Sequence, residues 1–362
     1  MHLSLRLENI SLTVDSEVHI YPTDLVLKKS TMNVLLGPTG AGKTTIMRIM
    51  AGLEYPTSGR LLWNDDDVTS RRVQDRDIAF VYQQFINYPS MSVYENIASP
   101  LRLKGAREAE IDFSVREAAG MMKLESYLDR LPLELSGGQQ QRCALARALV
   151  KGAGLVLLDE PLANLDYKLR EELRSEIPNI FEASGAIFVY ATTDPEEALL
   201  LGGNTASISE GKISQYGATP KVYHKPANKI TAETFSSPPM NFVSLHKRGG
   251  EIRIGGALTA AGGFENLQDG DYQAGFRPNH LSLKQEMNSV AFSAHLNSTE
   301  ITGSETFLHM QHGADHWVAL LHGVHDLPIG QDHKVYVGAD HIYTFDVDGA
   351  LVKPAPYAQG MA

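Results

Sequence analysis

The sequence predicts an α/β protein in which a parallel sheet with helices on both faces is followed by a smaller, β-rich domain. In residues 3–235, apolar strand-like segments alternate with helical ones, which is typical of a parallel sheet covered on both faces. One predicted strand runs into a glycine-rich stretch, and another ends in an acidic pair. Beyond residue 235, short β-like runs are separated by glycine turns and little helix is evident, which favours a barrel-like fold.

The elements follow in order along the first part of the chain. Residues 3–36 predict short strands, and the helix after the glycine-rich stretch has one apolar side made of Ile46, Met47, Ile49, Met50 and Leu53. A mainly helical region over 92–129 is interrupted near Pro100 and Gly105. The other expected strands are 33–36, 59–63, 78–82, 155–158 and 186–191, and the other expected helices are 139–150 and 167–183.

A domain boundary is predicted at Ser236-Ser-Pro-Pro, where the pattern changes. The two domains would then be 1–235 and 236–362. Short β-like runs in the second are 251–254, 317–321 and 334–337. Two domains also fit a length of 362 residues at ~150 residues per domain.

Composition narrows the class of protein. Hydrophobic residues make up 43% and charged residues 21%, which excludes disordered, collagen-like and disulfide-rich classes. The net charge of −11 disfavours nucleic acid as a partner. A single cysteine, Cys143, excludes an intrachain disulfide and fits a reducing cytoplasm. The start of the chain alternates like a strand rather than a signal peptide, and no apolar run approaches the ~18 residues of a membrane span.

The strongest motif is the glycine-rich stretch between a predicted strand and a predicted helix. It consists of Gly37, Pro38, Thr39, Gly40, Ala41, Gly42, Lys43, Thr44 and Thr45, and it fits the phosphate-loop pattern G-x4-G-K-[ST]. Backbone N–H groups of such a loop surround anionic oxygens, and the helix N-terminus favours negative charge. Lys43 is expected to contact the β- and γ-phosphates of ATP, and Thr44 to hold Mg²⁺.

A second motif is the apolar strand that ends in Asp159 and Glu160. Ligands of open α/β sheets gather at the carboxyl ends of strands. Asp159 is expected in the Mg²⁺ shell, and Glu160 is expected to take a proton from the attacking water or to orient it. Alone, this acidic pair could be a helix N-cap; together with the glycine loop it indicates a nucleoside triphosphate site.

A third motif, Leu135-Ser136-Gly137-Gly138-Gln139, precedes a predicted helix and could bind an anion. From the residues alone it could serve the same nucleotide or another. Ten of the 13 histidines lie after residue 240. They could bind metal, but no paired ligand spacing recurs, so we expect polar strand residues.

The three motifs together resemble the ATPases of ABC transporters, over residues 3–235. Leu-Ser-Gly-Gly-Gln looks like their signature, and Gln83 in Val-Tyr-Gln-Gln-Phe resembles the glutamine that couples to the membrane subunits and joins the Mg²⁺ site. Asp166 in Leu-Ala-Asn-Leu-Asp resembles the loop that crosses the dimer. The resemblance implies a parallel core sheet, an antiparallel β subdomain and a helical subdomain.

In this family two ATPase domains pair head to tail. The resemblance therefore implies that Ser136, Gly137, Gly138 and Gln139 contact the ATP held by the partner.

The second domain resembles the OB-like (TOBE-type) regulatory domain of the maltose-importer ATPase subfamily, which drives import of sugars, polyols and glycerol phosphates. The matching segments begin at Pro239, Gly275, Ile301 and Tyr343. Segments that begin at His19, Val81 and Asn96 further resemble one ATPase of the rhizobial-type glycerol importer, which uses two non-identical ATPases.

Partners follow from this resemblance. They are two integral membrane permeases, a sister ATPase in a hetero- or homodimer and, indirectly, a periplasmic solute-binding protein, with no nucleic acid. The chain would be peripheral, at the cytoplasmic face of the inner membrane. Tyr82, Phe85 and Tyr88 could line the groove for partner helices, or belong to the core.

The sequence departs from the family at two positions. The family has a histidine at the γ-phosphate where this chain has Thr193, and losing such a contact costs ~10²–10³ in rate. Unless a water bridges the gap, the chain's own site should be slow and an intact sister ATPase should accompany it. The family's adenine-stacking aromatic aligns with Val14, and Tyr21 is a nearby substitute unless it is simply an exposed strand residue.

Two other functions remain open. A soluble ABC-type ATPase not tied to transport is disfavoured, because the chain has neither a coiled-coil insertion nor a second cassette. The β domain could also sense a regulator through Gly303-Ser-Glu305 and Phe276-Arg277, unless these are turn and core residues.

Overall fold

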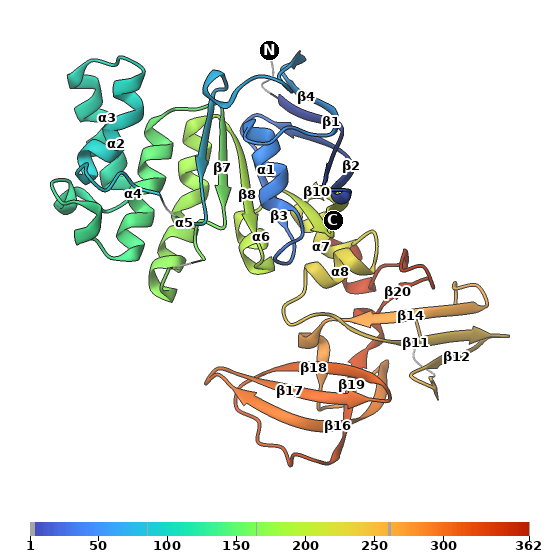
Figure 1. The fold of residues 1–362 in the computed structure, drawn as a ribbon. Helices are drawn as coiled ribbons and strands as arrows, with labels where there is room; N and C mark the ends of the chain where they lie inside the picture. Colours follow the sequence, from blue (N-terminus) through green and yellow to red (C-terminus); the bar gives the residue numbers. More distant parts are fainter. Residues whose placement is uncertain (1–3, 85, 164, 260–261, 362) are drawn as a thin grey trace. The chain divides into compact units, whose positions relative to one another are not determined.

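The computed structural model describes residues 4–84, 86–163, 165–259 and 262–361. It divides into two compact units, Met1–Tyr216 and Gly217–Ala362 (Figure 1). The two units divide after Tyr216, so residues 217–235 fall in the second unit. The domain boundary that we predict after residue 235 stays a prediction. None of the helices in the described residues is long and apolar enough to cross a membrane.

The first unit contains the predicted parallel sheet. Its strands have the order β10-β9-β3-β8-β7-β6, and β3 pairs in parallel with β8 and β9, as β7 does with β6 and β8. The strands are β3 (Met32–Leu36), β6 (Ile78–Val81), β7 (Leu155–Asp159), β8 (Ile187–Thr192), β9 (Asn204–Ser209) and β10 (Lys212–Ala218). β7 and β8 are buried along their whole length, as expected for strands covered on both faces.

Alternating side chains of β8 show which helices cover each face. Ile187, Val189 and Ala191 belong to the core that α1 (Lys43–Ala51) shares with the antiparallel sheet. Phe188 points the other way and lies 4.0 Å, between ring centroids, from Phe181 of α5 (Tyr167–Ser184). α6 (Pro195–Leu201) packs against β3 and β8.

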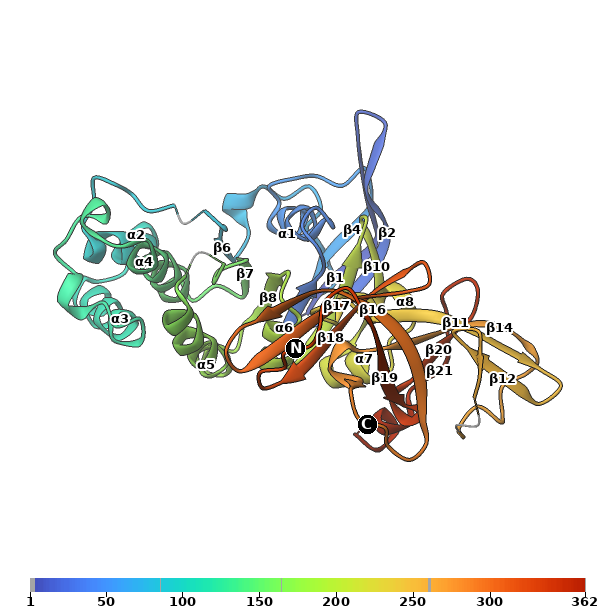
Figure 2. The same ribbon diagram turned by 90° about the horizontal axis from the view of Figure 1, so that it is seen from below.

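The antiparallel sheet of the first unit has the order β2-β1-β4-β5, in agreement with the expected antiparallel subdomain. Its strands are β1 (Ser4–Val14), β2 (Glu17–Lys28), β4 (Ser58–Trp63) and β5 (Asp66–Asp67). Its leucines pack on the apolar side of α1. Figure 2 shows the long β1–β2 hairpin extending away from the rest of this sheet.

A helical subdomain contains α2 (Val93–Leu103), α3 (Glu108–Met121) and α4 (Gly137–Val150). Our expected break at Pro100 is wrong, because α2 continues through this proline. Proline has no N–H to donate to Asn96, and the Ser99 hydroxyl donates to that carbonyl instead, at 2.8 Å. α4 also begins two residues earlier than predicted, since Ser136 caps it.

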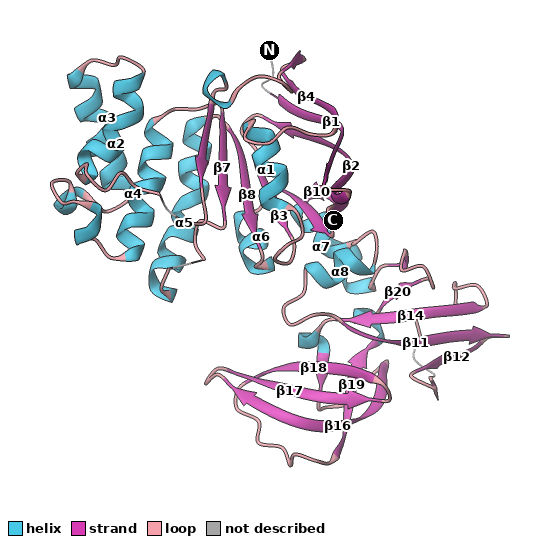
Figure 3. Cartoon of the chain, viewed as in Figure 1, coloured by secondary structure: helices cyan, strands magenta, loops and turns pink. Residues whose placement is uncertain are grey.

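The second unit is β-rich, as predicted (Figure 3). One sheet has the order β13-β12-β11-β14-β20-β21 and the other β15-β19-β16-β17-β18, and Trp317, Phe276 and Phe292 meet in its core. The strands are β11 (Asn241–Arg248), β12 (Glu251–Ile254), β13 (Ala257–Leu258), β14 (Gly270–Phe276), β15 (Leu281–Ser282), β16 (Ser289–Ile301), β17 (Glu305–His312), β18 (Asp315–His322), β19 (Asp332–Gly338), β20 (Tyr343–Phe345) and β21 (Leu351–Lys353).

Short helical segments complete the two units. The second unit contains the helices α7 (Thr219–His224) and α8 (Lys229–Thr234). Short 3₁₀ segments lie at η1 (Val73–Asp75), η2 (Glu125–Tyr127), η3 (Pro132–Glu134), η4 (Pro278–His280), η5 (Ala339–His341) and η6 (Pro356–Met361).

Candidate functional site

The glycine loop connects the end of β3 to the start of α1. Gly40 and Gly42 have φ angles of 80° and 101°, a region that side chains other than glycine rarely adopt. Gly37 is needed for a different reason, because a Cβ there would lie 2.1 Å from the Ile208 carbonyl oxygen of β9. The loop is therefore fixed by backbone geometry in front of the α1 N-terminus, where N–H groups favour an anion.

Lys43 folds its side chain back over this loop. Its Nζ donates to the carbonyl oxygens of Gly37 at 2.8 Å and Pro38 at 3.0 Å, and it lies 3.5 Å from Glu160 Oε1. Burial lowers the pKa of Lys43, and the nearby Glu160 carboxylate opposes that shift. The arrangement holds a cation inside the loop, 4% exposed, where a phosphate could pair with it.

Thr44 and Asp159 meet across the first turn of α1 and the end of β7. The Thr44 hydroxyl donates to the two Asp159 oxygens at 2.9 and 3.1 Å. Burial raises the pKa of Asp159, while the hydrogen bond from Thr44 opposes the increase. A hydroxyl and a carboxylate oxygen are ligands that Mg²⁺ prefers, and a cation would offset the burial of the carboxylate. The donor set therefore fits the expected ion.

Glu160 lies between Lys43 and Gln83. Gln83 Nε2 donates to Glu160 Oε2 at 3.1 Å, and the Glu160 N–H donates to Ala191 O at 3.0 Å. The φ of Glu160 is 45°, a left-handed conformation that costs a non-glycine residue about 1–2 kcal/mol. This backbone turns the carboxylate away from the strand and toward the loop.

One cavity of about 600 Å³ collects these groups, a volume within the range of small-molecule sites. The predicted site residues that line it are Tyr21, Thr39, Gly40, Gly42, Lys43, Thr44, Thr45, Gln83 and Glu160. Asp159 is not a lining residue, but it accepts a hydrogen bond from the lining residue Thr44. Tyr21 is 39% exposed, and Lys212 Nζ lies 4.2 Å from its ring centroid. Val14 does not line the cavity.

The remaining lining residues were not predicted from the sequence. They are Glu17, Val18, His19, Glu210 and Gly211, from the start of β2 and the turn between β9 and β10. Gly211 brings this turn to the loop, since its N–H donates to Ala41 O and its carbonyl accepts from the Tyr21 N–H, both at 2.9 Å. Two strands separated by Glu210-Gly211 form a hairpin signal that could have located the turn.

Other predicted residues lie elsewhere in the first unit. The signature residues begin α4, where Ser136 Oγ accepts from Gln139 N at 3.3 Å and Gln139 Oε1 accepts from Ser136 N at 2.9 Å. Asp166 is exposed and directly precedes α5. Thr193 is exposed just after β8 and does not line the cavity. The roles of these residues stay predictions.

Two further expectations concern aromatic and histidine residues. Tyr82 and Tyr88 line a second cavity of about 710 Å³, and Phe85 lies outside the described residues. Across the described parts of the chain, no three His, Cys, Asp or Glu side chains are grouped to hold a metal ion. The His280 and His341 rings contact each other with their centroids 4.0 Å apart and their planes tilted by 33°.

Arg277 belongs to the interior of the second unit. It is 3% exposed and donates to Phe235 O at 2.8 Å and Tyr223 O at 2.9 Å. Phe276 is also fully buried. For these two residues, burial favours the core interpretation over a regulator surface.

Comparisons with known proteins agree with this geometry. The family model described as "ABC transporter" matches residues 21–163. The chain is 36% identical over 327 residues to the sn-glycerol-3-phosphate import ATP-binding protein UgpC of Vibrio vulnificus (strain CMCP6), covering 89% of this chain and 88% of the relative. It is 36% identical over 318 residues to the multiple sugar-binding transport ATP-binding protein MsmK of Streptococcus mutans, covering 82% of this chain and 84% of the relative.

Among solved structures, a dimer of the ATP-binding cassette MJ0796 bound to ADP and Pi is similar. Its TM-score is 0.54 and its sequence identity is 28%, covering 59% of this chain and 98% of that chain.

Proposed function

The chain belongs to the family of ABC transporter ATP-binding proteins, and on that premise we propose that it hydrolyses ATP to energise an importer. The observation that carries this proposal is the convergence of Lys43, Thr44 with Asp159, and Glu160 with Gln83 on one cavity. These residues supply a cation, two oxygen ligands and a carboxylate, which are the groups that phosphoryl transfer needs.

Each group has a role in the proposed reaction. Lys43 Nζ exchanges its loop carbonyls for β- and γ-phosphate oxygens, and the N–H groups of the loop bind the same phosphates. Thr44, Asp159 and Gln83 would hold Mg²⁺, which would neutralise charge on the phosphates. Glu160 accepts a hydrogen bond from Gln83 through one oxygen and orients or deprotonates the attacking water through its carboxylate. Tyr21 lies at the cavity where a base could stack.

A second ATPase completes the site. We propose that two cassettes pair head to tail, so that Ser136, Gly137, Gly138 and Gln139 contact the partner's ATP and Asp166 lies at the dimer contact. The exposure of Ser136, Gly137 and Asp166 and their separation from the chain's own cavity support this arrangement.

The proposed partners are two integral membrane permeases at the cytoplasmic face of the inner membrane, and indirectly a periplasmic solute-binding protein. The cavity beside Tyr82 and Tyr88 supports a docking site for permease helices. The solute is a sugar, polyol or glycerol-type molecule, as the names of the relatives suggest, and we favour glycerol because of the segments that begin at His19, Val81 and Asn96.

We further propose an unequal pair of ATPases, in which this chain's own site is slow. The hydroxyl of Thr193 is shorter than an imidazole, and its absence from the cavity lining supports the loss of a direct γ-phosphate contact.

The experiment measures ATP turnover in three samples: this chain alone, this chain co-expressed with a sister ATPase, and the two ATPases together with the permeases. We expect slow turnover alone and faster turnover in the mixed assembly. Normal turnover by the chain alone would refute the unequal pair. No gain from Thr193→His would show that the imidazole is not limiting. If neither the ATP turnover nor the amount of protein recovered with membranes changes when the permeases are present, a soluble ABC-type ATPase is favoured instead.

A further inference from the structure

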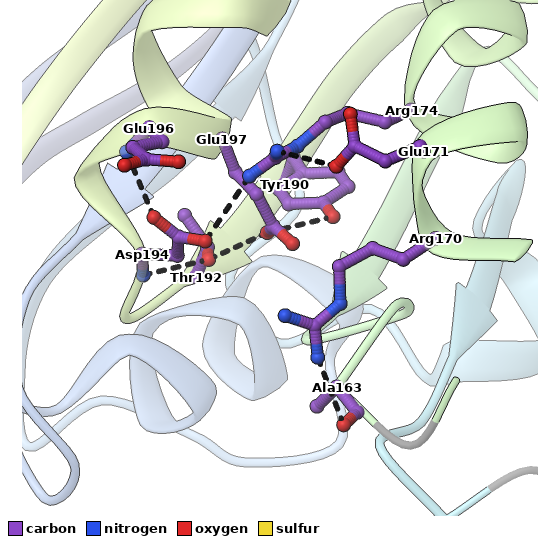
Figure 4. A network of polar contacts seen from close by, with 9 residues as sticks. All are labelled: Ala163, Arg170, Glu171, Arg174, Tyr190, Thr192, Asp194, Glu196 and Glu197. Carbon is purple, nitrogen blue, oxygen red and sulfur yellow. Dashed lines mark hydrogen bonds and ion pairs between the residues drawn. The ribbon is translucent and has the colours of Figure 1, made fainter. Parts of the chain in front are cut away.

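The turn after β8, which carries Thr193, is anchored by a buried carboxylate (Figure 4). Glu197 Oε2 accepts hydrogen bonds from the Thr192 hydroxyl at 2.7 Å and the Tyr190 hydroxyl at 3.0 Å. Thr192 Oγ1 in turn accepts from the Asp194 N–H at 3.0 Å. Glu197 is only 5% exposed, so this carboxylate has few alternatives to its two hydroxyl partners.

The same turn is also tied to α5 through Arg174. Arg174 Nη2 donates to Asp194 Oδ2 at 3.1 Å, and Nη1 donates to Glu171 Oε1 at 2.9 Å. The other Asp194 oxygen, Oδ1, accepts from Glu196 N at 2.8 Å and caps α6. Asp194 thus has one oxygen for the helix cap and one for the arginine, and the two contacts can be separated by mutation.

One helical turn earlier, α5 holds a second segment near the site. Arg170 Nη2 contacts Ala163 O at 3.4 Å, and the Arg170 N–H donates to Asp166 O at 2.9 Å. Ala163 lies between Glu160 and Asp166 in the chain. In Figure 4, Arg170 and Arg174 extend from the same helix toward these two different segments.

We propose that Arg174 is a positioning residue for ATP hydrolysis, which keeps the turn of Thr193 in register with the segment from Glu160 to Ala163 that follows β7. Both segments leave neighbouring parallel strands, where Asp159 of β7 pairs with Ala191 of β8. α5 acts as a strut between them, with Arg174 at one segment and Arg170 at the other. The proposal rests on the proposed function, because it concerns the same ATP site.

The charged guanidinium of Arg174 is buried. It is 8% exposed, and its partners Asp194 and Glu171 are 32% and 41% exposed. A buried guanidinium with two carboxylates fixes direction as well as distance, so a neutral side chain of similar length should loosen the turn without emptying the phosphate loop. Lys43 is held by loop carbonyls and Glu160, and Thr44 is hydrogen-bonded to Asp159; none of these contacts uses Arg174, and ATP affinity should therefore persist.

The first test compares Arg174→Gln, Arg174→Lys and Asp194→Asn with wild type in the full chain assembled with its sister ATPase. Asp194→Asn keeps an oxygen for the α6 cap and removes the ion pair. Arg116→Gln is the matched control, because Arg116 makes an exposed ion pair with Asp112 on α3. We expect Arg174→Gln and Asp194→Asn to lower kcat about 10- to 100-fold with KM for ATP changed less than about twofold. Arg174→Lys keeps the charge but not the fork that faces two carboxylates, and it should recover only part of the loss.

Two kinetic outcomes would overturn the proposal: a kcat for Arg174→Gln equal to that of Arg116→Gln, or a higher KM with an unchanged kcat. The double variant Arg174→Gln/Asp194→Asn should lose no more than Arg174→Gln alone, since both changes remove the same Arg174–Asp194 contact. Additive losses would contradict the claim that the ion pair carries the effect.

A second measurement keeps the two proposals distinguishable. Hydrogen–deuterium exchange of the full chain should rise in Arg174→Gln at peptides that contain Thr193 and Ala163, and not in Arg116→Gln. If wild type fails to hydrolyse ATP in any assembly, the proposed function is refuted. The exchange result alone then decides whether Arg174 holds the two segments in place. Exchange equal to wild type at both peptides would overturn it.

Discussion

Replacing Gly37 with alanine tests whether the glycine loop is held in place by close packing against β9. The new Cβ would lie 2.1 Å from the Ile208 carbonyl oxygen, whereas ordinary contact begins at 3.4 Å. The obstacle is backbone in a paired strand rather than a movable side chain, since β9 pairs with β3. One of the two must move.

Overpacking of this kind costs about 1–3 kcal/mol, with rigid neighbours at the upper end. We therefore expect Gly37→Ala to lower the free energy of unfolding of the first unit by about 3 kcal/mol. For a unit of this size that corresponds to a fall in Tm of roughly 6–12 °C. The matched control is Gly40→Ala in the same loop, where a Cβ meets nothing within 4 Å and only the φ of +80° is unfavourable, at about 1 kcal/mol.

Urea unfolding measures the difference. The chain has two tryptophans, of which Trp63 packs on the core of the first unit and Trp317 on that of the second. A Trp317→Phe background isolates Trp63 fluorescence for both variants. The reasoning is refuted if Gly37→Ala unfolds at the same urea concentration as Gly40→Ala or at a higher one.

Two predictions concern the second unit. Burial lowers the pKa of His280 to about 3 from its ordinary 6.5. Between these two pH values the unfolded chain binds a proton that the folded unit does not. The free energy of unfolding of the second unit should therefore fall by up to ~1.4 kcal/mol per pH unit as the pH falls below about 6.5. Urea midpoints at pH 7.5 and 5 check this, and His280→Phe should flatten the dependence; an equal slope in both proteins would contradict it. Arg277→Leu should lower the free energy of unfolding by about 3 kcal/mol, because the carbonyls of Phe235 and Tyr223 lose their charged donor. Trp317 fluorescence in urea measures this, and an unchanged midpoint would argue against it.

The strand–loop–helix around Lys43 and the strand that ends at Asp159 could be predicted from the sequence. Their signals are local: an apolar run, then glycines or an acid, then a helical pattern. Their meeting at one edge also follows from sequence, because parallel strands present their carboxyl ends together. The structure adds the contacts between Thr44 and Asp159 and between Gln83 and Glu160, while their catalytic roles stay predictions.

The other side of the cavity could not be predicted in the same way. Glu17, His19 and Glu210 reach it only because the Tyr21 N–H bonds to Gly211 O, a contact between segments almost 200 residues apart. Pro100 shows a different limit, since a local rule predicted a helix break there. The Ser99 hydroxyl donates to the Asn96 carbonyl that proline leaves unpaired, and α2 continues to Leu103.

The left-handed backbone of Glu160 also restricts how this position can evolve. Glycine, asparagine or aspartate would adopt its φ of 45° with less strain, yet each removes or shortens the carboxylate between Lys43 and Gln83. β-Branched residues are excluded by the backbone alone. A substitution that relieves the backbone strain at this position therefore gives up the carboxylate that contacts Lys43 and Gln83.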